Sequence, residues 1–235
     1  SEKDESAVMD IQDTSIENIY YSPNGLISDK DGSRSISEYD GTADVIIDFS
    51  HHTAVKDILP YAIEHKIPVV IATTGHDAEE KALIEEAAKS IPVFFSANMS
   101  LGIATLCSFV KTAAKLFPDA DIEIVETHHN RKLDAPSGTA LMIANAIKCV
   151  RNAATFAMGR SGQGKRTAQE IGIHAVRMGN IVGTHEVLIG TDTETITLKH
   201  EAHSRALFAD GAMAAAEFLC GKPAGLYNMQ DLIKF

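Results

Sequence analysis

Most of the side chains that could carry chemistry lie in one short segment, Glu126-Thr-His-His-Asn-Arg-Lys-Leu-Asp-Ala-Pro-Ser-Gly-Thr-Ala140. Three nitrogen bases in it, His128, His129 and Lys132, fall within five consecutive residues. A histidine near its ordinary pKa exchanges a proton close to neutral pH, and a lysine beside an imine can donate one. The segment therefore indicates proton transfer to a bound substrate.

The same segment predicts an anion site at the start of a helix. Ser137 is a favourable N-cap, and Gly138 and Thr139 then carry unpaired backbone N–H groups in the first turn. Such a helix start, with the positive end of its dipole, suits a carboxylate. Together with Lys132 and His129, it predicts a pocket that holds two carboxylates.

Other interpretations of this segment stay open on spacing alone. The two histidines could be a surface pair, and Lys132 a solvated loop charge. A metal site is not expected, because neighbouring residues on a strand point to opposite faces and His128 and His129 would not converge on one ion.

The elements around the segment follow two patterns. Between residues 45 and 95, short strands that are apolar on both faces alternate with amphipathic helices, which is typical of parallel βαβ units. The expected strands are 45–50, 68–72 and 92–95, and the expected helices are 53–66 and 77–90. Pro60 lies inside the first helix, where we expect a kink or a break.

The second half of the chain has a different texture. We expect helices over 100–117, 139–150 and 205–219, and a strand over 121–127. Three more strands, 171–178, 181–189 and 193–200, are joined by Gly179-Asn180 and Gly190-Thr-Asp192, which are hairpin signals. The sequence therefore predicts two domains: a Rossmann-like α/β domain over 1–100 and 207–235, and an α+β domain over 101–206 with a mixed, largely antiparallel sheet.

The composition of the chain limits the kinds of partner that it can bind. The 235 residues are 45% hydrophobic, enough for a core, and carry a formal net charge of −11, which argues against nucleic-acid binding. No apolar run approaches the roughly 20 residues of a membrane span. The three cysteines lie far apart without metal-ligand spacing, which favours a reducing cytoplasm. The histidines outside the segment are expected at surface or satisfied core positions.

Segment 126–140 resembles the signature of dihydrodipicolinate reductases, in which two histidines, a lysine three positions on and a D-A-P-S-G-T run form the substrate site. Similar family motifs follow in order and spacing over residues 43–235. They are Asp48-Phe-Ser50, Ala72-Thr-Thr-Gly75, Ser96-Ala-Asn-Met-Ser100, Ile171-Gly-Ile-His-Ala-Val-Arg177, Ile181-Val-Gly183 and Gly221-Lys-Pro-Ala-Gly-Leu-Tyr227.

The resemblance implies an activity and a set of roles. The activity is reduction of 4-hydroxy-tetrahydrodipicolinate by NADH or NADPH, in a cytoplasmic homotetramer that assembles through the strands of 171–200. It implies that His128 is the principal acid/base, that Lys132 is a proton donor, and that the substrate is held by His129, Ser137, Gly138 and Thr139. The residues implied to line the cofactor are Ala72, Thr73, Thr74, Ser96, Ala97, Asn98 and Met99.

Two departures from the family qualify the resemblance. Residues 1–42 contain no apolar strand followed by the expected glycine-rich phosphate turn, so the dinucleotide-binding domain is incomplete at its N-terminus. Ala72 stands where the family usually has glycine, which crowds the approach of the backbone to a ligand. The alternatives are therefore a non-catalytic dicarboxylate-binding or assembly remnant of the same fold, or a related amino-acid dehydrogenase.

One further motif weighs less. Gly159-Arg-Ser-Gly-Gln-Gly-Lys-Arg166 matches G-x-x-x-x-G-K, but ends in arginine where a phosphate-binding loop needs serine or threonine. We interpret it as a flexible loop that closes over bound substrate, with a plain mobile surface loop as the alternative.

Overall fold

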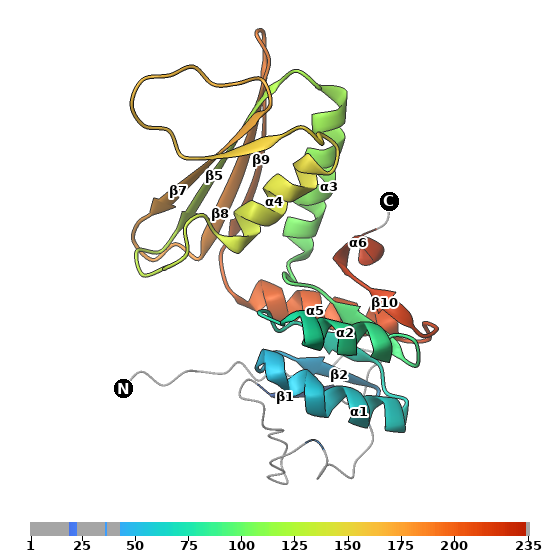
Figure 1. Ribbon diagram of the computed structural model, residues 1–235. Coiled ribbons are helices and arrows are strands. Elements are labelled where there is room, and N and C mark those ends of the chain that lie inside the picture. The colour runs from blue at the N-terminus through green and yellow to red at the C-terminus, as the bar shows by residue number, and fades with distance from the viewer. Residues whose placement is uncertain (1–18, 23–35, 37–42, 234–235) are drawn as a thin grey trace. The chain divides into compact units, whose positions relative to one another are not determined.

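The computed structural model describes residues 19–22, 36 and 43–233. They divide into two compact units (Figure 1). Unit 1 comprises the chain up to Ala97 together with Met213–Tyr227, and unit 2 comprises Asn98–Ala212 and the chain from Asn228. Helix α5, Ala206–Leu219, therefore begins in unit 2 and ends in unit 1. No helix in the described part of the chain is long and apolar enough to cross a membrane.

Unit 1 is built on a parallel sheet, as predicted. Its strand order is β1-β2-β3-β4-β10, and every pairing is parallel. Strands β2 and β3 are buried along their whole length, because helices lie beside the sheet and the strands are apolar on both faces. The strands are β1 Ile19–Ser22, β2 Val45–Asp48, β3 Val69–Ile71, β4 Pro92–Phe95 and β10 Gly225–Tyr227.

The helices of unit 1 begin and end for local reasons. A short 3-10 turn, His52–Ala54, leads into α1, Val55–His65, which runs through Pro60; the predicted break does not occur. Helix α1 ends at Lys66, whose φ of 56° stops the helical repeat. Helix α2, Ala78–Ala87, begins with a capping box between Asp77 and Glu80.

Most of residues 1–42, where the family's first strand and phosphate turn were not found, lie outside the described residues. Strand β1 was not predicted, yet it pairs in parallel with β2 from Ile19↔Val45 to Ser22↔Asp48. The glycines of residues 1–42, which are Gly25, Gly32 and Gly41, lie outside the part of the chain that the structure describes.

Unit 2 has a mixed sheet, also as predicted, with strand order β6-β7-β5-β8-β9. Strand β5 pairs in parallel with β7 and antiparallel with β8, β6 is parallel to β7, and β9 is antiparallel to β8. The predicted β8–β9 hairpin forms. The strands are β5 Asp121–His128, β6 Thr155–Met158, β7 Glu170–Arg177, β8 Gly183–Gly190 and β9 Thr195–Ala202.

The predicted hairpin between β7 and β8 is wrong, because β5 lies between them. The Gly179-Asn180 turn instead carries the chain over the end of β5, where the N–H of Asn130 donates to the carbonyl of Gly179. The N–H of His129 likewise donates to the carbonyl of Ile181 at 2.8 Å. Strand β6, which has no clear alternation, was not predicted.

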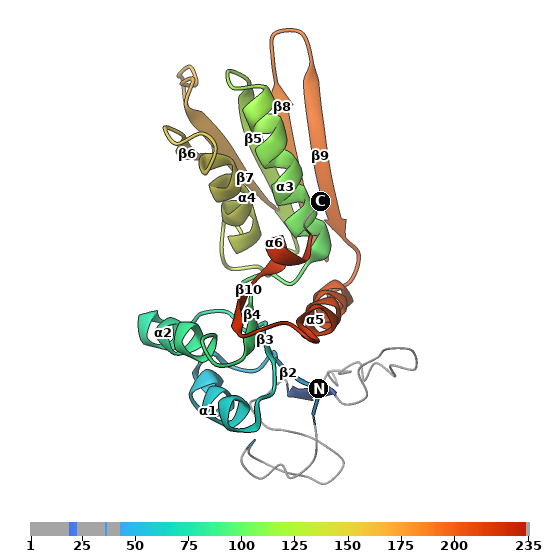
Figure 2. The same ribbon diagram turned by 90° about the vertical axis from the view of Figure 1, so that its right-hand side faces the viewer.

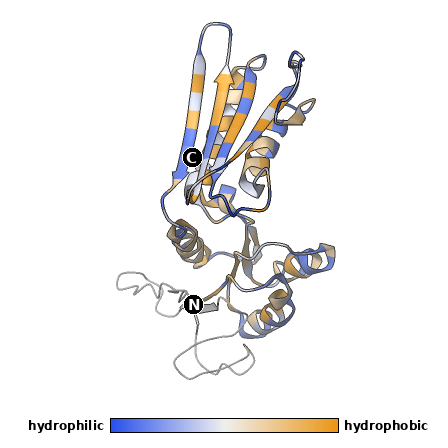
Figure 3. Ribbon diagram, turned by 90° about the vertical axis from the view of Figure 1, so that its left-hand side faces the viewer, coloured by the Kyte–Doolittle hydropathy of each residue, from blue (hydrophilic) through white to orange (hydrophobic). Residues whose placement is uncertain are grey.

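Helices α3, Leu101–Leu116, and α4, Gly138–Lys148, cover one face of this sheet (Figure 2). Their apolar sides pack on the alternate residues of β5, β7 and β8 that point to this face, which form the core of unit 2. The final short helix α6, Met229–Leu232, contacts α3. The opposite face of the sheet carries stripes of polar and apolar residues and has no helix of unit 2 over it (Figure 3).

Candidate active site

The alternation of β5 places Glu126 and His128 on the buried, helix-covered face of the sheet. Glu126 has no exposed surface, and His128 is 8% exposed at the end of the strand. Nδ1 of His128 lies 2.6 Å from Oε2 of Glu126. A histidine at a strand end, oriented by a buried carboxylate, has the arrangement of a general acid or base.

Glu126 is bound on both oxygens. Arg177, on the neighbouring strand β7, donates from Nη1 to Oε2 and from Nη2 to Oε1, both at 2.8 Å. The N–H of Ser137 donates to Oε1 at 2.9 Å. Burial is the largest influence on the pKa of Glu126 and acts to raise it, but the hydrogen bonds from Arg177, His128 and Ser137 outweigh burial and lower the pKa. Glu126 is therefore an ionised carboxylate at neutral pH.

Ser137 caps α4 as predicted. Its buried hydroxyl oxygen accepts from the N–H of Ala140 at 3.1 Å, and the helix begins at Gly138. Oγ1 of Thr139 accepts from the side-chain amide of Asn98 at 3.0 Å. The predicted helix start therefore lies beside Glu126, and the N–H groups of Ser137 and Ala140 are already hydrogen-bonded there.

His185 is a residue of this site that sequence reasoning missed. It lies on β8 directly opposite Glu126, is 4% exposed, and its ring centroid is 5.2 Å from that of His128. Its Nε2 lies 3.1 Å from Oγ of Ser137. Burial lowers the pKa of His185 to about 4, so its ring is neutral at neutral pH. The alternation of residues along β8 indicates that His185 points to the buried face, but it does not show which strand lies beside it.

Lys132 and His129 lie in the loop between β5 and α4. Nζ of Lys132 is 2.7 Å from Oδ1 of Asp134, whose side chain is 57% exposed. The pKa of His129 is lowered, first by burial and then by neighbouring positive charges that include Arg131 and Lys132. The loop is thus locally positive in an acidic protein, as an anion site requires.

The residues predicted on the cofactor side fall in two places. Ala72–Thr74 and Ser96–Ala97 follow β3 and β4, which pair in parallel, so both groups lie at the same carboxyl edge of the unit 1 sheet. Thr73 is buried, and its hydroxyl donates to Oδ2 of Asp48 at 3.1 Å. Asn98 and Met99 belong to unit 2, where the side-chain oxygen of Asn98 accepts from the N–H of Ser100 at 2.8 Å.

Both units match the models of one family. Residues 4–99 match the N-terminal model of dihydrodipicolinate reductase, and residues 102–233 match the C-terminal model. The chain belongs to the dihydrodipicolinate reductase family.

Individual relatives agree with this assignment. The 4-hydroxy-tetrahydrodipicolinate reductase of Caldanaerobacter subterraneus subsp. tengcongensis is 54% identical over 201 residues, which cover 85% of this chain and 80% of that protein. The enzyme of the same name from Clostridium tetani is 50% identical, covering 81% of this chain and 75% of that protein. A dipicolinate-bound dihydrodipicolinate reductase from Paenisporosarcina sp. TG-14 has a TM-score of 0.69 and 26% identity, covering 81% of this chain and 74% of that one.

The family implies a nicotinamide dinucleotide, and the carboxyl edge of the unit 1 sheet has features that fit such a polar ligand. His76 follows Gly75, whose φ is +92°, and is 6% exposed. Neither ring nitrogen of His76 has a hydrogen-bond partner among the described residues. Buried polar atoms are rarely left without partners, so a group that supplies one fits this edge.

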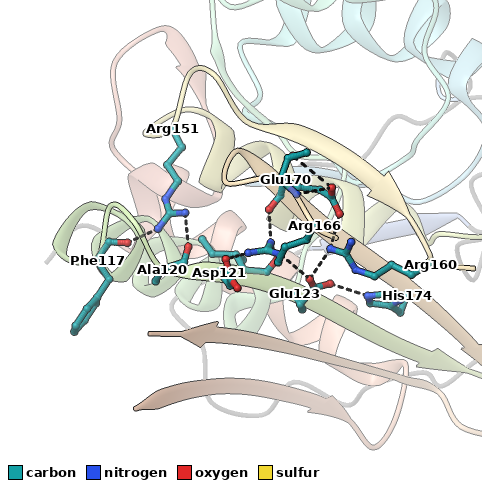
Figure 4. Close-up of polar contacts among 11 residues, drawn as sticks. Phe117, Ala120, Asp121, Glu123, Arg151, Arg160, Arg166, Glu170 and His174 are labelled. Atoms are coloured by element: carbon teal, nitrogen blue, oxygen red, sulfur yellow. Dashed lines mark hydrogen bonds and ion pairs between the residues drawn. The ribbon is translucent and has the colours of Figure 1, made fainter. Parts of the chain in front are cut away.

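The loop from Gly159 to Arg166 does not lie where the reductase substrate site was predicted. Arg160 and Arg166 both form ion pairs with Glu123, which points to the face of the sheet opposite Glu126 (Figure 4). His174 also contacts Glu123, with 2.7 Å between Nε2 and Oε2. In this structure the two arginines of the loop bind the face opposite Glu126, and closure of the loop over bound substrate stays a prediction.

Proposed function

We propose that the chain reduces 4-hydroxy-tetrahydrodipicolinate, by way of its dehydrated form dihydrodipicolinate, to tetrahydrodipicolinate in the biosynthesis of lysine and diaminopimelate. The names of the relatives support the substrate. The observation that carries the proposal is the buried arrangement of Glu126 and His128 beside the capped start of α4, in the segment that resembles the family signature.

The substrate has two carboxylates, and unit 2 offers two positive places for them. One carboxylate binds the first-turn N–H groups of α4 at Gly138 and Thr139, next to the cap residue Ser137. The other binds Lys132 and His129 in the adjoining loop. Lys132 is free to rearrange toward a ligand, because its partner Asp134 is largely exposed and such pairs are weak.

Reduction needs a hydride and a proton. NADH or NADPH supplies the hydride when bound, and we assign the balancing proton to His128, with Lys132 as a second donor. His128 is held in one orientation by Glu126 and by the edge of the neutral His185 ring, so it does not need to be ordered when the substrate binds.

On the cofactor side, we propose that Ala72, Thr73, Thr74 and the run Ser96–Met99 line the nicotinamide and ribose. The C-terminal ends of parallel strands are where dinucleotides bind in such sheets. Thr73 acts by holding the turn, since its hydroxyl is already bound to Asp48. Thr74 is exposed and available to a ligand.

We further propose a homotetramer that assembles through the sheet face that has no helix of unit 2 over it (Figure 3). On this face Val176 is 37% exposed, and Val125 and Leu188 are only half-buried. Burying this face against second copies would remove these side chains from water. Leu188→Lys should then yield smaller species in sedimentation velocity, whereas an unchanged mass would contradict the assembly.

A cytoplasmic location is also proposed. Cys107, Cys149 and Cys220 are all free thiols, and the last two are exposed. Unpaired exposed thiols are typical of reducing compartments.

The proposed function is tested by titrating NADH and NADPH into the full chain, with and without pyridine-2,6-dicarboxylate as a planar dicarboxylate mimic. We expect a dinucleotide to bind and the mimic to tighten it. Binding of the mimic without any dinucleotide would favour a dicarboxylate-binding protein without redox activity. His128→Ala should keep dinucleotide binding and lose turnover.

A further inference from the structure

We propose that Glu126, clamped by Arg177, is the positioning residue that keeps a proton on Nδ1 of His128. The imidazolium form of His128 then gives its second proton, the one on Nε2, to the substrate. The neutral ring that remains keeps its hydrogen on Nδ1 and regains the Nε2 proton from solvent. This inference rests on the proposed role of His128. It adds to that role a definite tautomer, a definite reacting nitrogen and a residue that sets both.

The tautomer follows from the contacts of Glu126. An ionised carboxylate can only accept hydrogen bonds. Its Oε1 accepts from Arg177 and Ser137, and its Oε2 accepts from Arg177. The remaining contact, 2.6 Å from Oε2 to Nδ1 of His128, is therefore a hydrogen bond only if Nδ1 carries the hydrogen.

Arg177 keeps this carboxylate charged. Glu126 is completely buried, and without a partner its neutral form would be favoured. The bidentate guanidinium supplies two charge-assisted hydrogen bonds and holds the carboxylate in one plane. A second bond from Nη2 of Arg177 to the carbonyl of Asp134, at 2.6 Å, ties the same clamp to the substrate loop.

With Nδ1 committed to Glu126, Nε2 is the nitrogen left for chemistry. No hydrogen bond to Nε2 is found among the described residues. Gly183, the first residue of β8, lies beside His128, and a Cβ built on it would stand 3.0 Å from Nε2. Glycine at this position therefore leaves the space beside Nε2 open. His185, the nearest ring, lies edge-on at 5.2 Å between centroids and is neutral.

Glu126 also joins the acid/base to the anion site. Oε1 fixes the N–H of Ser137, the N-cap of α4, while Oε2 fixes His128. One carboxylate thus sets the distance between the proton donor and the helix start that we assign to a substrate carboxylate. Loosening it should affect turnover more than dinucleotide binding, because every one of these contacts lies within unit 2.

The decisive measurement is the ring ¹⁵N chemical shift of His128 in the full chain at alkaline pH, where the neutral tautomer is observed. The signals are assigned by their absence in His128→Asn. We expect the hydrogen on Nδ1 in the wild type. In Glu126→Gln we expect a shift toward the Nε2–H form, because the amide cannot satisfy all these donors. We also expect a roughly 10²- to 10⁴-fold fall in kcat and an unchanged KM for the dinucleotide.

Glu123→Gln is the matched control. Glu123 lies three residues earlier on the same strand and also binds arginines, but on the opposite face. It should leave both the tautomer and kcat at wild-type values. Glu126→Asp retains the charge, and we expect it to recover part of the kcat lost in Glu126→Gln.

Two results would overturn the proposal: a wild-type His128 with its hydrogen on Nε2, or a Glu126→Gln protein with near-wild-type kcat. The wild-type spectrum needs no variant, so the test holds even if Glu126→Gln does not fold. Failure of the proposed function is separate, since it would appear in the wild type as no dinucleotide binding and no turnover, whatever the tautomer. Undiminished turnover in His128→Ala would instead remove the role of His128 on which this proposal rests.

Discussion

Replacing Arg177 with methionine removes the guanidinium but keeps most of the apolar length of the side chain. Glu126 then loses two of its four hydrogen bonds while it stays fully buried. Removing one partner of a buried ion pair costs about 3–5 kcal/mol. The Arg177 side chain is 19% exposed, so water can replace part of the lost contact. We therefore expect the free energy of unfolding at pH 7.5 to fall by about 3 kcal/mol.

The pH dependence gives this prediction a sign. In the wild type the pKa of Glu126 is lowered, so its ionised form stabilises the fold above the ordinary pKa of glutamate, and that stability is lost as pH falls through the lowered value. Without Arg177, burial should raise the pKa instead. The variant then gains protonated Glu126 as pH falls, and its deficit relative to wild type should shrink between pH 7.5 and 5.

Urea unfolding followed by far-ultraviolet circular dichroism, at one protein concentration, measures both effects. Arg160→Met is the control, because Arg160 forms ion pairs with partly exposed carboxylates, including Glu123, on the other face of the sheet. Arg160→Met should lower the free energy of unfolding much less than Arg177→Met does. Its difference from the wild type should not shrink as pH falls. Equal losses in the two variants, or a deficit for Arg177→Met that is constant with pH, would refute the reasoning.

Three further predictions concern neighbouring residues. Lys132→Ala should lower kcat roughly 10²-fold while the unfolding midpoint stays within error, because its ion-pair partner Asp134 is 57% exposed; parallel losses would argue for a structural role. His185 binds a proton less readily in the fold than in the unfolded chain, so its contribution falls as pH drops from about 6.5 to about 4. Between pH 7 and 4 the free energy of unfolding of His185→Gln should therefore fall by up to about 3 kcal/mol less than that of the wild type, as measured by urea titrations. Gly183→Ala should push His128 aside and lower kcat roughly tenfold, whereas Gly164→Ala, with nothing within 4 Å of its added methyl group, should not; steady-state assays of both decide this.

The segment from Glu126 to Ala140 could be predicted because its signals are local. The N-cap at Ser137 and the strand before it are readable within fifteen residues, and both form where expected. The roles assigned to the three bases stay predictions. The capping box of Asp77 is local in the same way. Of the kink or break predicted at Pro60, the break does not occur, since α1 continues through this residue.

What could not be predicted depends on which strands become neighbours. Arg177 reaches Glu126 because β7 pairs in parallel with β5, although 51 residues separate them. Nothing in the Gly179-Asn180 turn distinguishes a hairpin from a crossing over the end of β5. The same sheet order brings His185 opposite Glu126. Periodicity shows which face a residue points to, but not what it meets there.

Strand β5 shows how the alternation of side chains between the two faces of a sheet affects function. Glu123 and Glu126 are the same residue type, three positions apart, and both bind arginine. Because three is odd, they point to opposite faces. Glu123 is partly exposed and binds the loop arginines Arg160 and Arg166, whereas Glu126 is enclosed with His128 under the helices. Burial, not residue type, makes Glu126 a strong acceptor that can orient a proton donor, since the same hydrogen bond is much weaker in contact with water.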